Sequence, residues 1–251
     1  MSLYQKLRQL QLGYLLVLWL AALWLAWLLV AQWNFFYPVW YDWLAIDHTI
    51  AEYGPQNRYR QGFEQTSRAE RERLLAALVT AIHNDGSGLD TLRYHAPDGK
   101  VLGVFLRPPE ILHLQDVARL LNTLRWLGWA AVVTWLLLTL HRALRRISPP
   151  SPRRVVLSSL AVLVLLGIGV VLMGPVRVFY QLHIWIFPPG HPWFFYYQDS
   201  LMTTLLKAPD IFAPITLSWL LLSVLILALL LGLARVLNTV VLKTTGKAAA
   251  E

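Results

Sequence analysis

The sequence predicts an all-α polytopic membrane protein with four transmembrane helices and a small α+β extracytoplasmic cap. Two observations carry this prediction. First, 57% of the 251 residues are hydrophobic, and they gather in four stretches that can cross a bilayer core or be extended to do so. Second, Lys and Arg collect in the segments that four spans would place on one side of the membrane, as cytoplasmic segments do.

The first apolar stretch, residues 13–33, contains no charged residue, and about twenty such residues cross a bilayer core. It is too long and too rich in Trp for the core of a signal peptide, and no Ala-x-Ala cleavage site follows it. We therefore expect residues 1–33 to form a short cytoplasmic segment and a retained first transmembrane helix.

Residues 34–108 are too many for a hairpin between two spans, so we expect them to form the extracytoplasmic cap. Ser67 and Glu70 have the spacing of a capping box, and apolar residues at helical spacing follow them. The segment 84–88 is rich in Gly, Asn and Asp and is expected to end that helix. Alternating residues around a Pro-Asp-Gly-Lys turn predict a β-hairpin within residues 92–106.

The start of the next helix is expected at residue 109, because proline fits a first turn and Glu110 complements the positive end of the helix dipole. This long helix, residues 109–146, would include the second span. An Arg- and Pro-rich loop at 147–154 would lie in the cytoplasm, and the apolar residues 155–174 would form the third span.

Residues 175–210 hold many aromatic residues, two histidines and few charges, and we expect an extracytoplasmic loop that lies in the membrane interface or re-enters it. The apolar stretch 211–235 would form the fourth span, with Pro214 tolerated in its first turn. Residues 236–251 would be a cytoplasmic tail.

The net charge of +8 follows from topology rather than from nucleic-acid binding. Residues 34–125 hold ten Lys and Arg against eleven Asp and Glu, and no basic groove with interleaved aromatic residues appears. Both termini are therefore expected to be cytoplasmic. The excess positive charge lies in three segments: Lys6 and Arg8; Arg142, Arg145, Arg146, Arg153 and Arg154; and Arg235, Lys243 and Lys247.

The strongest candidate for chemistry is His113, which precedes the second span. An ionisable group at the mouth of a membrane helix is costly to keep there and tends to be functional. Glu110, His113 and Asp116 follow one another at spacings of three, so neighbouring pairs lie on nearly the same helix face. Spacing alone leaves two interpretations open: a catalytic histidine, or a structural one bonded to either carboxylate.

The second outer segment offers His183 as a further candidate, whereas His191, between Gly190 and Pro192, is ambiguous. Asp199 is either a cap in this loop or an orienter of a histidine, and its spacing favours the cap. The chain has no Cys and no three-ligand spacing, so we expect neither a metal nor a cofactor. Aromatic residues of this segment are interface anchors or the lining of an acyl-chain groove: Trp185, Trp193 and Phe195.

Two segments resemble the lipoprotein intramolecular transacylase (Lit) family of bacterial integral membrane proteins. The first, before the second span, is Glu110-x-x-His113-x-x-Asp116-Val117. The second lies before the fourth span and reads His183-x-x-x-Phe187, then Trp193-x-Phe195, Asp199-x-Leu201-Met202 and Pro209-x-x-Phe212. The resemblance covers most of the chain in layout and is specific in these two segments.

The resemblance implies a catalytic His113 with His183 as its partner, supported or oriented by Glu110, Asp116 and Asp199. It implies a diacylated lipoprotein substrate in contact with membrane lipid. An acyl chain would move from the sn-2 position of the diacylglyceryl group to the amine of the N-terminal cysteine, which gives a lyso-form lipoprotein. The site would lie at the outer face of the bacterial cytoplasmic (inner) membrane.

The chain departs from the family pattern in the turn 188–191 and in the shape of the cap, so fold and site carry over better than the substrate. Acyl-chain preference and oligomeric state are open. Two other functions stay possible: a non-catalytic protein that binds lipid or lipoprotein, and an acyltransferase or lipase of the outer leaflet that acts between molecules.

Overall fold

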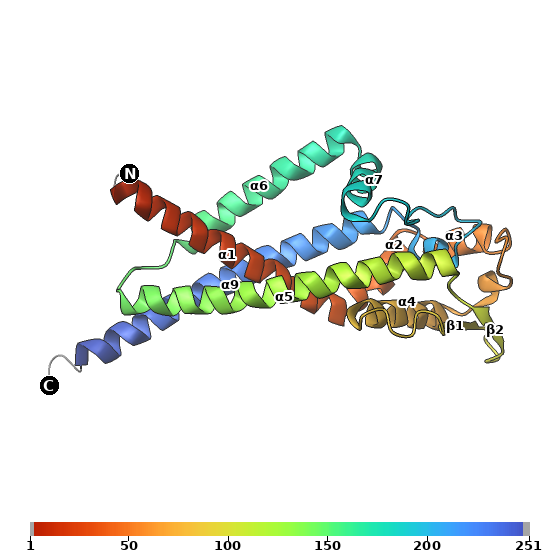
Figure 1. Cartoon of the computed structure of the whole chain (residues 1–251), viewed down its shortest axis with the longest axis horizontal. Helices are drawn as coiled ribbons and strands as arrows, with labels where there is room; N and C mark the ends of the chain where they lie inside the picture. Colours follow the sequence, from red (N-terminus) through yellow and green to blue (C-terminus); the bar gives the residue numbers. More distant parts are fainter. Residues whose placement is uncertain (1–2, 248–251) are drawn as a thin grey trace. The chain divides into compact units, whose positions relative to one another are not determined.

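The computed structural model describes residues 3–247 and the side chains of residues 11–242 (Figure 1). The chain divides into two compact units. Unit 1 comprises residues 1–29, 124–169 and 218–251, and unit 2 comprises residues 30–123 and 170–217. The elements are α1 (Leu3–Gln32), η1 (Asn34–Phe36), α2 (Tyr37–Trp43), α3 (Ile46–Tyr53), η2 (Phe63–Gln65), α4 (Arg68–His83), β1 (Arg93–His95), β2 (Val101–Val104), α5 (Pro108–Leu144), α6 (Pro152–Met173), α7 (Pro175–Ile186), α8 (Leu201–Leu206) and α9 (Phe212–Lys247).

The predicted fold class is confirmed. The described residues are mostly helical and contain a single two-stranded antiparallel sheet, β1–β2. Four of the described helices are long and apolar enough to cross a membrane: Gln11–Gln32, Pro108–Leu144, Pro152–Met173 and Phe212–Leu242. The protein is thus a multi-pass membrane protein.

Unit 1 packs parts of α1, α5 and α9 around small residues. Ala21, Ala22, Ala131 and Ala234 are buried in its core. Helices in lipid gain no hydrophobic drive toward one another, so small side chains that allow close backbone approach favour their packing. Two polar contacts add to this packing, because the Trp219 indole N–H donates to the Leu23 carbonyl over 2.9 Å and the hydroxyls of Tyr14 and Thr139 lie 3.1 Å apart.

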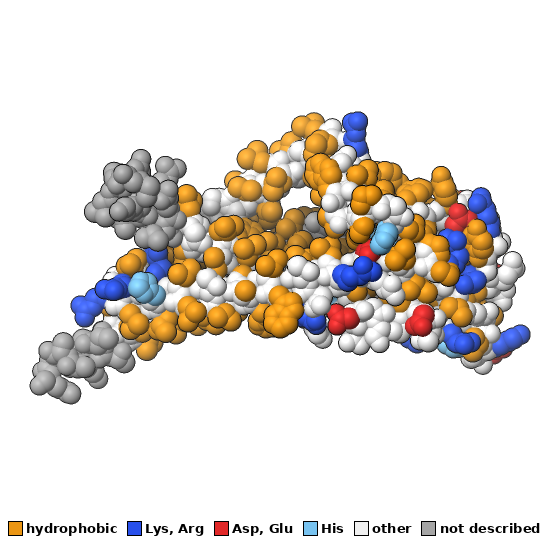
Figure 2. Space-filling view, in the orientation of Figure 1, with side chains coloured by type: hydrophobic (Ala, Val, Ile, Leu, Met, Phe, Trp, Pro, Cys, Tyr) orange, Lys and Arg blue, Asp and Glu red, His pale blue; other side chains and the backbone are white. Residues whose placement is uncertain are grey.

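The outer surface of unit 1 is apolar, as a lipid-facing surface must be. In α6 only Val155 and Ser159 are buried, while most of its Leu and Val side chains are exposed. Figure 2 shows hydrophobic side chains along the length of this helix. Lipid tails are as apolar as these side chains, so the exposure costs nothing in a bilayer.

The cap lies in unit 2 and has a core of its own. Ser67 caps α4 by accepting a hydrogen bond from the Glu70 backbone N–H over 3.2 Å, which is one half of the predicted capping box. The Glu70 carboxylate bonds Arg73 and His95 instead of completing the box. Arg71 is buried, and each of its three guanidinium nitrogens has a partner: Thr66, Tyr41 and the Glu64 carbonyl. A buried cation tolerates such a position only when its donors are satisfied in this way.

Residues 175–210 were expected to form a loop, and this is a correction: the segment contains the helices α7 and α8. Helix α6 ends at Met173, and the following Gly174 has a φ of 89°, which interrupts the helical backbone. Helix α7 then begins with Pro175, a residue that fits a first helical turn. Helix α8 is buried, and Ser200 caps it by accepting from the Thr203 backbone N–H over 2.9 Å. The aromatic density of the segment masked the pattern of α7, and α8 has only six residues, too few to show a helical repeat.

The segment is bonded to the cap within unit 2. The Tyr37 hydroxyl donates to the Leu205 carbonyl over 2.7 Å, and the Lys207 ammonium donates to the Leu44 carbonyl over 2.7 Å. Tyr53 and Tyr197 stack with ring centroids 4.8 Å apart. The cap therefore holds residues 175–210 in place beside the start of α5.

Candidate functional site

His113 lies on α5, about a turn and a half after the helix begins at Pro108, and it is buried. Its ring is surrounded by other rings: Phe187 at 4.8 Å, His183 at 6.1 Å and Phe195 at 6.3 Å between centroids. The Nδ1 atom is buried and has no hydrogen-bond partner among the described residues. Buried polar atoms are nearly always bonded, so an unpartnered ring nitrogen here points to a role with a substrate.

His183 reaches the same place from α7. Its Nδ1 lies 2.8 Å from the Phe179 carbonyl oxygen, one helical turn earlier. Because a carbonyl only accepts, Nδ1 carries the proton in this contact, and the Nε2 atom of the neutral ring is left as an acceptor. Burial lowers the pKa of His183 below its ordinary value, and the bond to Phe179 opposes this shift only in part.

Aromatic side chains form the wall around the two histidines. Trp193 lies against His183 with centroids 5.0 Å apart, and Phe187 contacts both imidazoles. Trp193 and Phe195, named from the sequence as groove candidates, are thus adjacent to the histidine pair. Trp185 is 73% exposed and is not part of the ring contacts described for this wall.

Glu110 is fully buried at the start of α5, where it fixes the end of the helix. Its Oε2 accepts from the Arg107 backbone N–H over 2.7 Å, and its Oε1 accepts from the Ser200 hydroxyl. Ser200 is also the cap of α8. Glu110 therefore ties the helix that carries His113 to α8, and its support for His113 is positional.

Asp116 is buried on α5, one turn beyond His113, and its carboxylate contacts His191 and Arg119. Its Oδ2 lies 2.6 Å from His191 Nδ1, and its Oδ1 lies 3.2 Å from an Arg119 guanidinium nitrogen. The resemblance implies that Asp116 supports or orients the site, and the side chains that its carboxylate contacts are His191 and Arg119.

Asp199 was expected to cap the loop or to orient a histidine. Its side chain instead pairs with Arg58, whose Nη1 lies 3.1 Å from its Oδ1. The cap of α8 is the next residue, Ser200. Asp199 therefore fastens the outer segment to the cap.

The arrangement places two imidazoles beside each other among aromatic rings. A neutral imidazole whose ring nitrogen is unpaired can take a proton from a nucleophile and return it to a leaving group. A second imidazole with a fixed tautomer can polarise or position the substrate. The described residues contain no group of three His, Asp or Glu side chains arranged to hold a metal ion.

Two residues of the site escaped the sequence analysis. Ser200 carries no motif that distinguishes it from an ordinary cap, and its bond to Glu110 joins positions 90 residues apart. His191 was left ambiguous because its partner Asp116 lies 75 residues away in the sequence. The only available signal was the placement of His191 in a Pro-Pro-Gly-His turn, whose Gly190 adopts a φ of 84°.

Comparisons with known proteins identify the family and the fold of the chain. A family model described as "Lipoprotein intramolecular transacylase Lit" matches residues 12–208. None of the curated proteins matches the chain.

Two solved structures of the membrane integral lipoprotein intramolecular transacylase Lit from Bacillus cereus are similar in fold; one has a histidine replaced by arginine and the other by alanine. The arginine variant has a TM-score of 0.57 and 14% identity, over 98% of this chain and 97% of that one. The alanine variant has a TM-score of 0.57 and 14% identity, over 97% of this chain and 96% of that one. At this identity the likeness shows the fold.

Proposed function

The chain belongs to the lipoprotein intramolecular transacylase family, Lit, and from this premise we propose that His113 and His183 carry its acyl transfer. Membership makes the protein a membrane-integral acyltransferase that acts on lipoproteins, so the non-catalytic alternative no longer stands. The observation that carries our proposal is the buried, unpartnered Nδ1 of His113 beside a second histidine.

In the proposed reaction, the amine nitrogen of the N-terminal cysteine attacks the carbonyl carbon of the sn-2 ester. His113 removes the amine proton, the bond from carbonyl carbon to glyceryl oxygen breaks, and the proton passes to that oxygen. An amide and a free hydroxyl result, so the product has the composition of the substrate and no co-reactant is consumed. Nucleophile and ester belong to one molecule, and holding them in contact can replace much of the barrier.

The substrate in this proposal is a diacylated lipoprotein, whose acyl chains suit the aromatic wall. Phe187, Trp193 and Phe195 surround the histidines with apolar surface, and a chain at the ester would displace water from the same place. Excluding water also protects the ester from hydrolysis. Trp185 is proposed to contact lipid rather than the reacting ester, because it is exposed.

The proposed orientation places both termini in the cytoplasm and the histidine pair at the outer face of the cytoplasmic (inner) membrane. The support is the distribution of Lys and Arg in the segments before α1, between α5 and α6, and after α9. Lipoprotein esters and N-terminal cysteines would meet the site at that face. Residues 34–108 and 175–210 would then be the outer segments.

A labelled lipopeptide tests the proposed chemistry. The full chain, reconstituted in vesicles, is given a lipopeptide with different sn-1 and sn-2 chains, mixed with a uniformly deuterated copy of it. We expect a product of unchanged mass in which the N-acyl chain is the former sn-2 chain, with no exchange between labelled and unlabelled molecules. Crossover products would establish transfer between molecules, an N-linked sn-1 chain would refute the regiochemistry, and free fatty acid as the main product would identify a lipase.

A further inference from the structure

Helix α2 has a second apolar side that the cap does not cover. Its buried residues, Tyr37 and Tyr41, lie one turn apart and pack into the core of unit 2. The other side carries Val39, Trp40 and Trp43, which lie within about 100° of one another around the helix, since each residue turns it by about 100°. Trp43 is 72% exposed and Val39 is 57% exposed. Large apolar side chains therefore face away from the cap core.

The turn before α2 adds two more rings to this surface. Asn34, Phe35 and Phe36 have φ values of 48°, 55° and 58°, the left-handed region in which a phenylalanine is strained. Phe35 is buried, whereas Phe36 is partly exposed and its ring centroid lies 5.5 Å from that of the exposed Trp33. The Trp40 indole N–H donates to the Phe35 carbonyl over 2.9 Å, which fixes the turn to the helix. Strain of this kind persists only where the surrounding structure or a function requires it.

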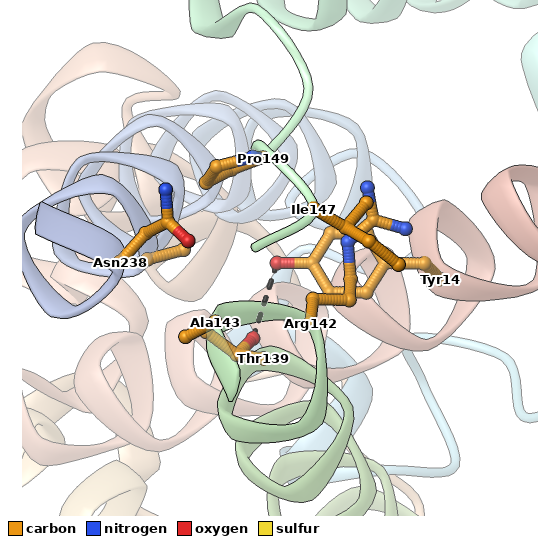
Figure 3. A pocket seen from close by; sticks show the side chains of 8 residues that line it. Tyr14, Thr139, Arg142, Ala143, Ile147, Pro149 and Asn238 are labelled. Carbon is orange, nitrogen blue, oxygen red and sulfur yellow. Dashed lines mark hydrogen bonds between the residues drawn. The ribbon is translucent and has the colours of Figure 1, made fainter. Parts of the chain in front are cut away.

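The exposed apolar surface, here called the α2 face, thus consists of Trp33, Phe36, Val39, Trp40 and Trp43. Its level in the membrane follows from the span that precedes it. Helix α1 is packed into the bundle of unit 1, where the Tyr14 and Thr139 hydroxyls are hydrogen-bonded (Figure 3).

The α1 span, Gln11–Gln32, rises about 33 Å at 1.5 Å per residue, slightly more than a hydrocarbon core of about 30 Å. Trp33 is the next residue, and its backbone N–H still donates to the Val30 carbonyl over 3.2 Å, so the chain turns without extending. The α2 face therefore begins at the border between the hydrocarbon core and the headgroups.

Lipid and a second copy of the chain are the two candidate occupants of this face. A Trp indole has an apolar body and a polar N–H, and it gathers at the border between membrane and water. The flank of α2 is polar, because Arg68 donates two hydrogen bonds of 2.7 and 3.0 Å to the exposed Asp42 carboxylate. A stable interface between proteins takes about 20–30 residues a side, many more than the α2 face offers. These observations favour lipid.

We propose that the α2 face inserts into the interfacial region of the outer leaflet and anchors the cap there. Helix α2 then lies along the membrane surface, with Val39 and Trp43 toward the acyl chains and the buried Tyr37 and Tyr41 toward the cap core. The partner is the lipid surface rather than one lipid molecule. The choice of leaflet follows from the proposed orientation, but insertion itself does not depend on the roles of the histidines.

The anchor also sets the depth of the histidine pair, and this part rests on the proposed function. The Tyr37 hydroxyl donates to the Leu205 carbonyl of α8 over 2.7 Å, and Ser200, the cap of α8, bonds Glu110 on α5. His113 lies one turn beyond Glu110 on the same helix. A continuous set of hydrogen bonds within unit 2 thus joins the anchored helix to the helix that carries His113.

Spin labels measure the insertion, because the chain contains no Cys. The full chain with a single cysteine at Val39 or Trp43 is labelled with a nitroxide in vesicles of phosphatidylethanolamine and phosphatidylglycerol. Collisions of the label with oxygen and with a water-soluble nickel complex are then compared. Leu165 on α6 is the lipid reference and Ser87 in the cap is the water reference, since both are exposed. We expect both labels on α2 to collide more with oxygen and less with nickel than the label at Ser87, toward the values at Leu165.

Nickel collisions at Val39 and Trp43 equal to those at Ser87 would place the α2 face in water and overturn the proposal. Few collisions with either reagent would show that protein covers the face, and would overturn it as well. Dipolar broadening between labels would then identify a second copy as the occupant. Both residues are exposed, so each variant keeps the core packing and reports alone if the other fails to fold.

The effect on depth has its own test, the double variant Val39→Asn/Trp43→Asn, compared with wild type in vesicles and in detergent micelles at matched protein levels. We expect lyso-lipoprotein formation to fall severalfold in vesicles, because small displacements of reacting groups cost much of the rate. It should change little in micelles, where no bilayer fixes the depth.

Equal losses in vesicles and micelles would indicate a damaged fold and refute the role in depth, and unchanged activity in vesicles would refute it too. If the wild type formed no lyso-lipoprotein, the proposed function would fail, while the collision measurements would still decide whether the α2 face is inserted.

Discussion

His191 Nδ1 lies 2.6 Å from Asp116 Oδ2, and this contact joins the outer aromatic segment to α5 one turn beyond His113. The segment that follows His191 carries Trp193 and Phe195, which lie against the two histidines. The contact therefore helps to hold the segment that forms the aromatic wall of the site. His191 acts in this proposal as a positioning residue, since its hydrogen bond goes to Asp116 rather than to the reacting atoms.

Asp116→Asn and His191→Gln should each lower the rate of lyso-lipoprotein formation by about tenfold, the lower range for a hydrogen bond to a charged group. The double variant should lose no more than either single one, because both changes remove one interaction. Initial rates in vesicles at matched protein levels measure this. If the fold-loss in rate of the double variant equalled the product of the two single losses, the two residues would act independently. That result would refute the positioning role.

Removal of His113 should have the largest effect of any single histidine. A general base contributes about a hundred- to ten-thousand-fold in rate, so His113→Ala should reduce product below detection in most assays. His183→Ala should cost less, or as much if the pair acts as a unit. The readout is product yield by mass spectrometry, with membrane content of the variants matched by immunoblot.

His48 provides the control for that experiment. It lies on α3 in the same unit with its side chain 83% exposed, so His48→Ala should keep wild-type yield. Near-wild-type conversion by His113→Ala would return His113 to a structural role. If His48→Ala were inactive at normal membrane content, loss of product would report loss of folding, and the His113→Ala result would not identify a base.

The pH dependence follows from the lowered pKa of His183. An unfolded histidine has a pKa of about 6.5, and the folded value lies below it. Neutral His183 therefore contributes stability that is fully present above about pH 6.5 and is lost as the pH falls toward the folded pKa. We expect the acid limb of the pH–rate profile to lie below about 6.5, together with acid-induced loss of thermal stability.

His183→Gln removes the titrating ring and should reduce the acid-induced loss of thermal stability. The measurement is the apparent melting temperature of the two proteins over an acidic pH series. A rate profile whose acid limb stands above 6.5, or identical acid sensitivity in both proteins, would contradict a neutral buried His183.

The topology is testable because the chain contains no Cys. Gly86 and Gly190 have φ values of 79° and 84°, where a side chain is strained, so neighbouring positions are better for labels. Single cysteines at the exposed residues Ser87 and Pro189 should react with an impermeant thiol reagent in intact cells, and one at Ser148 should not. Labelling at Ser148 before lysis would refute the four-span orientation.

The sequence predicted the parts of this fold whose signals are local. The span of α1, the cap at Ser67, the hairpin β1–β2 and the start of α5 beside Glu110 each depend on residues a few positions apart. Helix α7 was missed because its aromatic residues and those that follow it favour a membrane interface. Helix α8 was missed because its six residues, Leu201–Leu206, are too few to show a helical repeat, and it is defined by its burial against distant segments.

The sequence also predicted only part of the candidate site. His113 and His183 were named as candidates from their positions beside the membrane spans, the family resemblance paired them, and their ring centroids lie 6.1 Å apart in the structure. The hydrogen bonds of Glu110 and Asp116 could not be predicted, because their partners Ser200 and His191 lie in a segment whose fold was unknown. A helical spacing identifies which carboxylates share a face, but it does not say which distant residue they bond.

Packing between α1 and α5 supplies the last prediction. A Cβ atom added at Gly128 would lie 2.2 Å from the Trp24 Cγ atom, a distance that forces a shift of the indole near its root. Overpacking of this kind costs about 1–3 kcal/mol, so Gly128→Ala should lower the apparent melting temperature in detergent by several degrees. Gly167→Ala on α6 is the matched control, since nothing lies within 4 Å of the added atom and alanine favours a helix. A Gly128→Ala protein as stable as Gly167→Ala would mean that α1 and α5 do not approach this closely.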